Sequence, residues 1–342
     1  MMATASSTSL YFMTMSLLVS ATSAGVLEAS AFVPYPGYAG NLSVAGTVLL
    51  LDAVDGQMMF FHLTGVDTAC TAPTNDANSC GVHIHEGMTC ETASDIGGHY
   101  WSSTFVADDP WATVVYATAT GESTTMGAGI TVGTGVSNSD NLGRAFVVHD
   151  SSGARVACAT LASPAADSLL AAGFVPYAGY AGDYEVDGTV LIMTEGDTQT
   201  MYYSLSGVDT GCNSTPPNVA NACGVHIHVG TNCSVAAGGH NWNTDTVTED
   251  PWLSVTYDAS AGTGLGFAQS VLTGLSASAV DAAVFVVHDS SGARIGCAEI
   301  EPLSTVTTVS TTGETAVSYS LGFSAPSLAW IAFVLPMLLR SR

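Results

Sequence analysis

The stretch FVVHDSSGARVAC runs from Phe146 to Cys158, and FVVHDSSGARIGC runs from Phe285 to Cys297. Each opens with an aromatic and β-branched run, which favours a strand, and continues into Asp, Ser and Gly, which favour turns. Similar strand-like runs separated by turn residues stand at 44–51, 58–66, 80–85, 112–119 and 144–150. No long segment has a helical period. This pattern predicts an all-β sandwich or barrel.

The near-identity of the two stretches extends over most of the chain. FVPYPGYAG at Phe32 returns as FVPYAGYAG at Phe174, and LTGVDTAC and DDPW return as LSGVDTGC and EDPW. A unit of about 130 residues is too long for a solenoid repeat and indicates a tandem domain duplication. We predict one domain over 32–163 and a second over 173–302. The Ala-rich segment from Ser163 to Gly173 is the predicted linker.

The N-terminus carries the apolar run LYFMTMSLLVSATSA. It predicts a signal peptide over 1–24, with cleavage near Ala24 or, as an alternative, near Ala31. A buried N-terminal helix is the competing interpretation. Three Asn-x-Ser/Thr triplets, which agree with secretion, predict glycosylation at Asn41, Asn213 and Asn232.

The C-terminus predicts attachment to a membrane. A Ser/Thr-rich stretch over 303–321 has the composition of a solvated stalk, and an apolar tail with an internal proline lies in 322–342. A spanning helix needs about 20 apolar residues, and this tail is shorter. A GPI-anchor signal therefore fits best, with a short transmembrane tail as the alternative. Both predict an extracellular protein anchored to the cell surface.

The charge balance limits the partners. Of 342 residues only 5 are Lys or Arg, whereas 29 are Asp or Glu, which gives a formal net charge of −24. Nucleic acids bind to basic surfaces, so this composition argues against a nucleic-acid partner. The sequence leaves the oligomeric state open.

Eight of the nine histidines occupy matched positions in the two copies. They are His83, His85, His99 and His149, and then His226, His228, His240 and His288. In an HxH strand both rings point to the same face, which is half of a metal site. Hydrogen-bonded core histidines are the alternative. Four imidazoles suit copper or zinc, and spacing does not choose between them. The ninth, His62, aligns with Ser204, and we interpret it as a surface or packing residue.

Each copy also has four cysteines. They are Cys70, Cys80, Cys90 and Cys158, and then Cys212, Cys223, Cys233 and Cys297. In a secreted chain they predict disulfides, with three possible pairings per copy, and zinc ligation is the minor alternative.

Taken in order, HIH, Cys90, GGH, FVVHD and GARVAC resemble the copper/zinc superoxide dismutase family. That family has an HxH pair, a cysteine, a third histidine, a VVH strand, and an arginine three residues before the partner cysteine. The resemblance covers both copies. It implies a Greek-key β-barrel (an immunoglobulin-like sandwich) in each copy. It also implies disulfides Cys90–Cys158 and Cys233–Cys297, which leaves Cys70 with Cys80 and Cys212 with Cys223.

The resemblance further implies that the four histidines of each copy bind one copper ion, two per chain. Superoxide would be the substrate, converted to O2 and H2O2. Arg155 and Arg294 stand where the family's arginine guides superoxide to copper, and His99 and His240 would relay a proton. Outside the predicted signal and tail the only basic residues are Arg144, Arg155 and Arg294, so two of three occupy this site. An ion pair with a nearby Asp is the alternative for these arginines.

The sequence departs from the family at the zinc site. No histidine lies between His99 and His149, or between His240 and His288, so zinc is not expected. The family's long loop between the fourth histidine and the arginine is also missing, since only five residues separate His149 from Arg155. Because that loop helps to cover copper in the family, the resemblance implies a copper site that is more open to solvent here. These features resemble the copper-only, extracellular branch of the family.

Without zinc, another group must orient the third histidine. The repeated acids Asp108 and Asp109, and Glu249 and Asp250, are the candidates, with a turn acid before proline as the alternative.

A copper-binding surface protein for uptake or storage, and a structural wall domain, are the competing functions. Retention of the two arginines favours catalysis over both.

Overall fold

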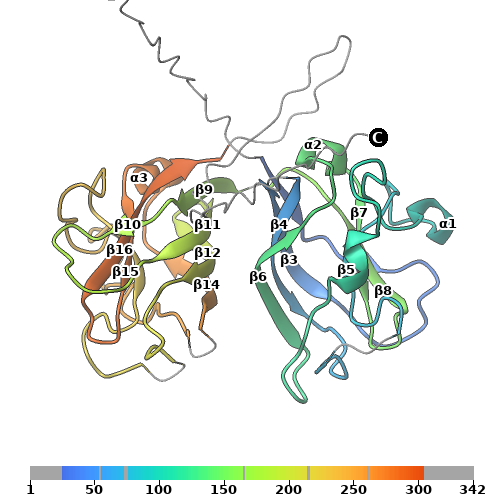
Figure 1. Cartoon of the computed structure of the whole chain (residues 1–342), viewed down its shortest axis with the longest axis horizontal. Helices are drawn as coiled ribbons and strands as arrows, with labels where there is room; N and C mark the ends of the chain where they lie inside the picture. The colour runs from blue at the N-terminus through green and yellow to red at the C-terminus, as the bar shows by residue number, and fades with distance from the viewer. Residues whose placement is uncertain are drawn as a thin grey trace, which may run out of the picture.

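The computed structural model describes residues 25–53, 55–72, 76–164, 166–213, 216–259 and 262–303 (Figure 1). Within these residues the chain is dominated by antiparallel β-sheets, which confirms the all-β sandwich class predicted from the sequence. The predicted signal peptide, the anchor signal and all but the first residue of the predicted stalk lie outside the described residues. None of the helices in the described part has the length and apolar character needed to cross a bilayer.

The first copy forms two four-stranded sheets, with strand orders β1-β3-β4-β6 and β2-β8-β7-β5. Its strands are β1 (Val26–Ala29), β2 (Val33–Pro34), β3 (Ala45–Ala53), β4 (Gly56–Thr64), β5 (Val82–Ile84), β6 (Thr124–Val132), β7 (Ala145–His149) and β8 (Arg155–Thr160). Its short helices are α1 (Ala93–Ile96), the 3-10 turn η1 (Pro110–Thr113) and α2 (Asn138–Asn141).

The second copy repeats this order in one eight-stranded sheet, β13-β15-β16-β9-β11-β12-β14, with β10 on β16. Its elements are β9 (Asp167–Ala172), β10 (Val175–Pro176), β11 (Asp187–Glu195), β12 (Thr198–Ser206), β13 (Val225–His228), β14 (Gly264–Leu272), α3 (Ala277–Asp281), β15 (Val284–His288) and β16 (Arg294–Pro302). The long β16 pairs with both β15 and β9 and so joins the two halves. In the first copy the bridge between Glu28 and Ala162 stands at the same place.

Each copy has its own apolar core between its sheet faces. Trp111 and Trp252 are fully buried there. The indole of Trp111 donates to the carbonyl of Tyr100 (2.7 Å), and that of Trp252 donates to the carbonyl of Asn241 (2.9 Å). Tyr100 and Asn241 directly follow His99 and His240. The buried tryptophans therefore fix the backbone beside the third histidine of each copy.

The predicted strand over 112–119 is wrong. Pro110 begins the turn η1, and the Asp109 carboxylate accepts the N–H of Trp111 and caps it. The backbone that follows makes an isolated bridge between Val115 and Gly81 and bonds to Cys80, so it braces a disulfide instead of extending a sheet.

Strands also begin before the predicted domain starts at residues 32 and 173. The predicted linker from Ser163 to Gly173 contains β9, which lies between β16 and β11 in the sheet. Leu169 and Ala171 face the core of the second copy, so this Ala-rich segment is a buried strand and not an exposed linker. Likewise β1 pairs with β3, and therefore cleavage near Ala24 would keep this strand whereas cleavage near Ala31 would remove it.

The two copies contact each other through β6 and the pair β12–β14 (Figure 1). A buried apolar cluster there includes Leu49 and Phe60 of the first copy and Leu191 and Tyr202 of the second. His62 stacks on Phe267 with ring centroids 4.4 Å apart, so it is a packing residue at this contact. The division of the chain into two independent domains stays a prediction.

Candidate metal centres

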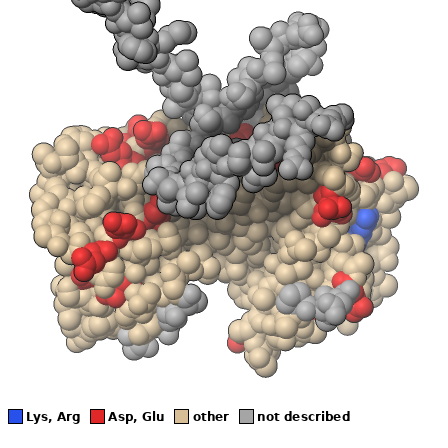
Figure 2. Space-filling model, in the orientation of Figure 1, with Lys and Arg blue, Asp and Glu red and all other residues tan. Residues whose placement is uncertain are grey.

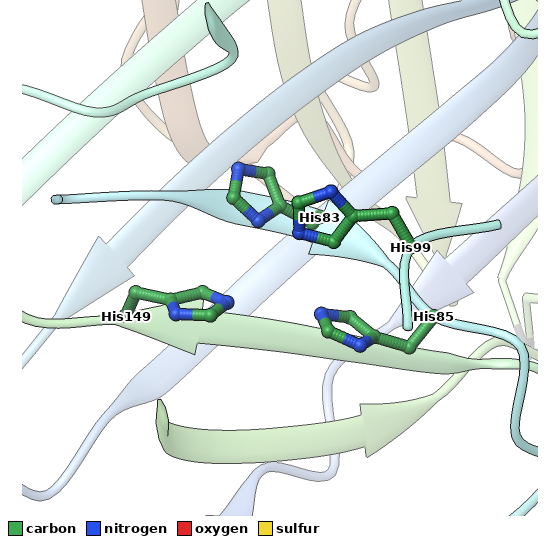
Figure 3. Close-up of side chains that lie close together, drawn as sticks. All are labelled: His83, His85, His99 and His149. Carbon is green, nitrogen blue, oxygen red and sulfur yellow. The ribbon is translucent and has the colours of Figure 1, made fainter. Parts of the chain in front are cut away.

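The four matched histidines of the first copy come together from two strands and one loop (Figure 3). His83 lies on β5, which pairs with β7, and His149 ends β7. His85 directly follows β5 and forms an isolated bridge with His99, which brings the third ring to the other two segments. One nitrogen from each ring lies within 4.8 Å of the others. Strand pairing therefore assembles the cluster.

The second copy builds the same cluster. His226 and His228 lie on β13, His288 ends the neighbouring β15, and His240 bridges to His228. Its ligand atoms also lie within 4.8 Å of one another. Two groups that could hold a metal ion are thus present in the described residues, at the positions predicted from the sequence.

Backbone carbonyls fix the orientation of three rings in the first cluster. The contacts are His83 Nε2 to Val114 O (3.0 Å), His85 Nδ1 to Gly97 O (3.1 Å) and His149 Nδ1 to Gly153 O (3.0 Å). A neutral imidazole that donates its proton to a carbonyl presents a lone pair on its other nitrogen. Those nitrogens, His83 Nδ1, His85 Nε2 and His149 Nε2, are buried and have no hydrogen-bond partner. Buried acceptors without partners fit a bound cation.

The second cluster has the same outer contacts. They are His226 Nε2 to Val255 O (3.0 Å), His228 Nδ1 to Gly238 O (3.1 Å) and His288 Nδ1 to Gly292 O (3.0 Å). His228 Nε2 and His288 Nε2 then face each other at 3.3 Å. Because both rings donate outward, two lone pairs meet across this distance, and a cation between them would relieve the repulsion.

The electrostatics keep these rings neutral. Burial, followed by repulsion from the neighbouring imidazoles, lowers the pKa of His83 and of His226 to about 2. Burial also lowers the pKa of His85 to about 3 and that of His149 to about 4, and the nearby Arg155 guanidinium adds to both. His228 and His288 follow the same pattern with Arg294. Neutral imidazole is the form that binds metal ions.

One acid of each candidate pair contacts the third histidine. Asp109 Oδ2 lies 2.6 Å from His99 Nδ1, and Asp250 Oδ2 lies 2.6 Å from His240 Nδ1. Asp108 and Glu249 are exposed. The carboxylate leaves Nε2 of each third ring for a metal, and His240 Nε2 has no hydrogen-bond partner. The aspartate before the proline therefore takes the orienting position, and the acid before it does not.

The two arginines lie directly beside the clusters. A register shift after Val148 places Arg155 opposite His149 across β7 and β8. Arg155 Nη2 donates to Gly97 O (2.8 Å), the same carbonyl that accepts the proton of His85. Arg294 Nη2 donates to Gly238 O (2.7 Å), which accepts from His228. Each guanidinium is thus linked to a cluster histidine through one shared oxygen.

Four disulfides connect the loops around the clusters. They are Cys70–Cys80, Cys90–Cys158, Cys212–Cys223 and Cys233–Cys297. These are the pairings implied by the resemblance, and the cysteines are accordingly not metal ligands. Disulfides of this number are typical of proteins that fold in an oxidising, extracellular environment.

The three predicted glycosylation sites differ in exposure. Asn41 and Asn213 are exposed. Asn232 is half-buried, and its side-chain oxygen accepts the backbone N–H (3.1 Å) and the hydroxyl (2.6 Å) of Ser234. Asn41 and Asn213 are therefore the more accessible acceptors.

Sequence reasoning did not single out the glycines that precede the HxH pairs. A Cβ on Gly81 would overlap Cε1 of His83, and a Cβ on Gly224 would overlap Cε1 of His226. The repeated CGVHIH pattern carried this signal, since a glycine at a close approach leaves room that no other residue leaves.

No model of a known protein family matches this chain, and no curated protein matches it either. The site must therefore be interpreted from its own geometry.

Proposed function

We propose that this protein is an extracellular copper-dependent superoxide dismutase with one copper ion in each copy. The observation that carries the proposal is the combination, found twice, of inward-facing neutral imidazoles with an arginine bound to the carbonyl that orients one of them. Imidazole ligands suit copper, and the arginine suits a small anion. The sequence resemblance to the copper/zinc superoxide dismutase family supports the same conclusion.

His83, His85, His99 and His149 would hold the first ion, and His226, His228, His240 and His288 the second. Bound copper would supply one-electron redox chemistry, by which two superoxide ions and two protons would give one O2 and one H2O2. The buried carbonyl contacts hold the rings in one orientation, so the ligand geometry is fixed before the metal binds. Zinc is not part of the proposal.

Arg155 and Arg294 attract the substrate. The chain is strongly acidic, and Figure 2 shows acidic side chains spread over one face of the molecule. Such a surface repels superoxide at long range. A guanidinium next to the cluster creates a local positive field, and this field places the anion where the reaction occurs.

We assign the proton relay to His99 and His240. Each is the least buried ring of its cluster, and an aspartate contacts its Nδ1. That contact holds the proton on the outer nitrogen, so the inner nitrogen is the atom that can take up and release a proton. The predicted signal peptide and C-terminal anchor would place this activity at the cell surface, attached to a membrane.

The proposal is tested by loading the full ectodomain with copper, measuring copper and zinc per chain, and following superoxide decay. We expect two copper ions per chain, no zinc, and decay that is accelerated in proportion to bound copper. Replacing both arginines by methionine should keep the copper and slow the decay by about tenfold or more, since the anion loses the guanidinium directly beside each cluster. Bound copper without accelerated decay would overturn the proposal and favour a copper-binding protein for uptake or storage.

A further inference from the structure

The repeated segments FVPYPGYAG and FVPYAGYAG each place a tyrosine beside the arginine of their copy. Tyr35 follows β2, which pairs with β8, and its N–H donates to Val156 O (3.0 Å), one residue after Arg155. Tyr177 follows β10 in the same way, and its N–H donates to Ile295 O (3.1 Å). The backbone therefore holds each tyrosine next to the first residue of the arginine strand.

The tyrosine hydroxyl contacts the guanidinium directly. Arg155 Nη1 donates to Tyr35 Oη (2.8 Å), and Arg294 Nη1 donates to Tyr177 Oη (2.6 Å). Both contacts are partly buried. A hydrogen bond to a charged donor is stronger than one between neutral groups, and burial strengthens it further.

The same hydroxyl also bonds to the loop that leads to the third histidine. Tyr35 Oη donates to Ala93 O (3.3 Å), and Tyr177 Oη donates to Ala237 O (3.3 Å). The two loops differ, because the first contains the helix α1 and spans 91–98, whereas the second spans only 234–239. In both copies the tyrosine hydroxyl bonds to the arginine and to the loop before the third histidine. These contacts are kept although that loop differs in length between the copies. A merely incidental surface contact would not be expected to persist through that change.

A long arginine side chain loses considerable rotamer freedom when it is held in one place. In the first copy the carbonyl contact fixes only Nη2 of Arg155, and the Tyr35 hydroxyl fixes Nη1 as well, so the planar guanidinium is held at two corners. In the second copy Nη1 of Arg294 donates both to the Tyr177 hydroxyl and to Ala237 O (2.6 Å). Tyr35 also packs against the buried apolar cluster that contains Cys158, and Tyr177 packs against the corresponding cluster that contains Cys297. Each tyrosine thus joins the arginine to the residues around a disulfide.

We infer that Tyr35 and Tyr177 are positioning residues that hold Arg155 and Arg294 in the orientation that receives a small anion at each metal centre. This inference rests on the proposed function for the identity of the anion. The positioning role itself does not depend on the proposed function, since any small monovalent anion would meet the same guanidinium.

The test uses the full copper-loaded ectodomain and azide as the anionic probe. In the variant Tyr35→Phe with Tyr177→Phe, we expect the azide Kd measured by visible absorption to rise about fivefold and the superoxide decay rate per copper to fall by a similar factor, because one charged hydrogen bond is lost at each site. Copper content and the electron paramagnetic resonance spectrum without azide should stay unchanged, because no cluster ring contacts these hydroxyls.

The chain offers a matched control three residues further along the same motif. Tyr38 and Tyr180 accept the N–H groups of Leu42 (3.4 Å) and Tyr184 (3.2 Å) through their hydroxyls. The variant Tyr38→Phe with Tyr180→Phe should leave azide affinity unchanged. In a background with Arg155→Met and Arg294→Met, removal of the Tyr35 and Tyr177 hydroxyls should cause no further loss, since they act through the arginines.

Three results would overturn the inference: an azide Kd equal to that of the control variant, an equal loss in the background without arginines, or an altered spectrum before azide is added. A failure of the proposed function is recognised separately. If copper-loaded wild-type protein does not accelerate superoxide decay, the function is wrong, whereas a weaker azide affinity in the tyrosine variant still supports the positioning role.

Discussion

The two metal centres share the carbonyl and carboxylate contacts that orient their histidines. They differ at the rim, the residues around each cluster that correspond to Glu86, Tyr100 and Arg144 of the first copy. In the first copy the Arg144 guanidinium carbon lies 3.3 Å from the centroid of the Tyr100 ring, and Nη1 donates to Glu86 O (2.6 Å). The Glu86 carboxylate in turn accepts the N–H of Gly98 (3.2 Å), next to His99. A charged side-chain network thus ties the third-histidine loop to the rest of the copy.

The second centre has no such network at the matched positions. Ala283, Asn241 and Val229 stand where the first copy has Arg144, Tyr100 and Glu86. Yet His228, His240 and Arg294 keep the distances of their counterparts within a few tenths of an ångström. Buried carbonyl and carboxylate contacts therefore set the cluster geometry, whereas the charged side chains at the edge of the first centre stabilise one loop.

Removal of one ligand from one copy should have the largest effect. His83→Ala deletes an inner ligand, so copper per chain should fall from two to one and superoxide decay per chain should fall by about half. Metal content and decay of the purified protein measure both. His62→Ser, which installs the residue found at the matched position of the second copy, should keep both ions. Loss of both ions in His83→Ala would show that the two centres depend on each other.

The next effect concerns the acid behind the third ring. Asp109→Asn should weaken copper binding at the first centre by about 10- to 100-fold, because the amide no longer fixes the ring as a carboxylate does. Asp250→Asn should do the same at the second centre. Competition with a chelator of known affinity measures the change. Asp108→Asn is the control and should bind copper normally; equal effects of the Asp108 and Asp109 variants would contradict the assignment.

These inner residues are also the part that the sequence predicts well. Histidines and cysteines are rare, repeated and ordered, and each has chemistry that few structures can satisfy. The sequence could not choose Asp109 over Asp108, because that choice depends on how Pro110 and the buried Trp111 turn the backbone. The sequence also did not reveal β9, because its Ala-rich residues are those of a linker as much as of a strand, and only the pairing with β16 and β11 makes it one. Residues 112–119 have the composition of a strand but bond to the Cys70–Cys80 loop instead of to a sheet.

At the rim we expect a smaller and local effect. Arg144→Ala removes the bonds to Glu86 O and Asp140 O and the contact with Tyr100, so the free energy of unfolding should fall by about 1 kcal/mol, a modest value because these groups are partly exposed. Amide hydrogen exchange should rise at Gly98 and stay unchanged at Gly239. Copper content should stay at two, and a loss of copper from the first centre would show that the rim charges shape the cluster after all.

The smallest effect concerns a buried polar pair that the second copy lacks. Asp52 Oδ1 accepts the backbone N–H of Asn138 (2.6 Å), and burial raises the Asp52 pKa to about 6. Thr194 and Ala277 occupy the matched positions in the second copy. An acid whose pKa is higher when folded binds more protons in the native state, so the first copy loses stability as pH rises from about 4 to about 6.

Asp52→Asn removes this titration and keeps the acceptor oxygen. The variant should therefore be more stable than the wild type above pH 6, by on the order of 1 kcal/mol after allowance for partial exposure, and equally stable near pH 4. Thermal unfolding of the metal-free protein across this range measures the difference. An Asp52→Asn gain that is as large at pH 4 as at pH 7 would mean that the buried charge is not its origin, and that the two copies differ here in packing alone.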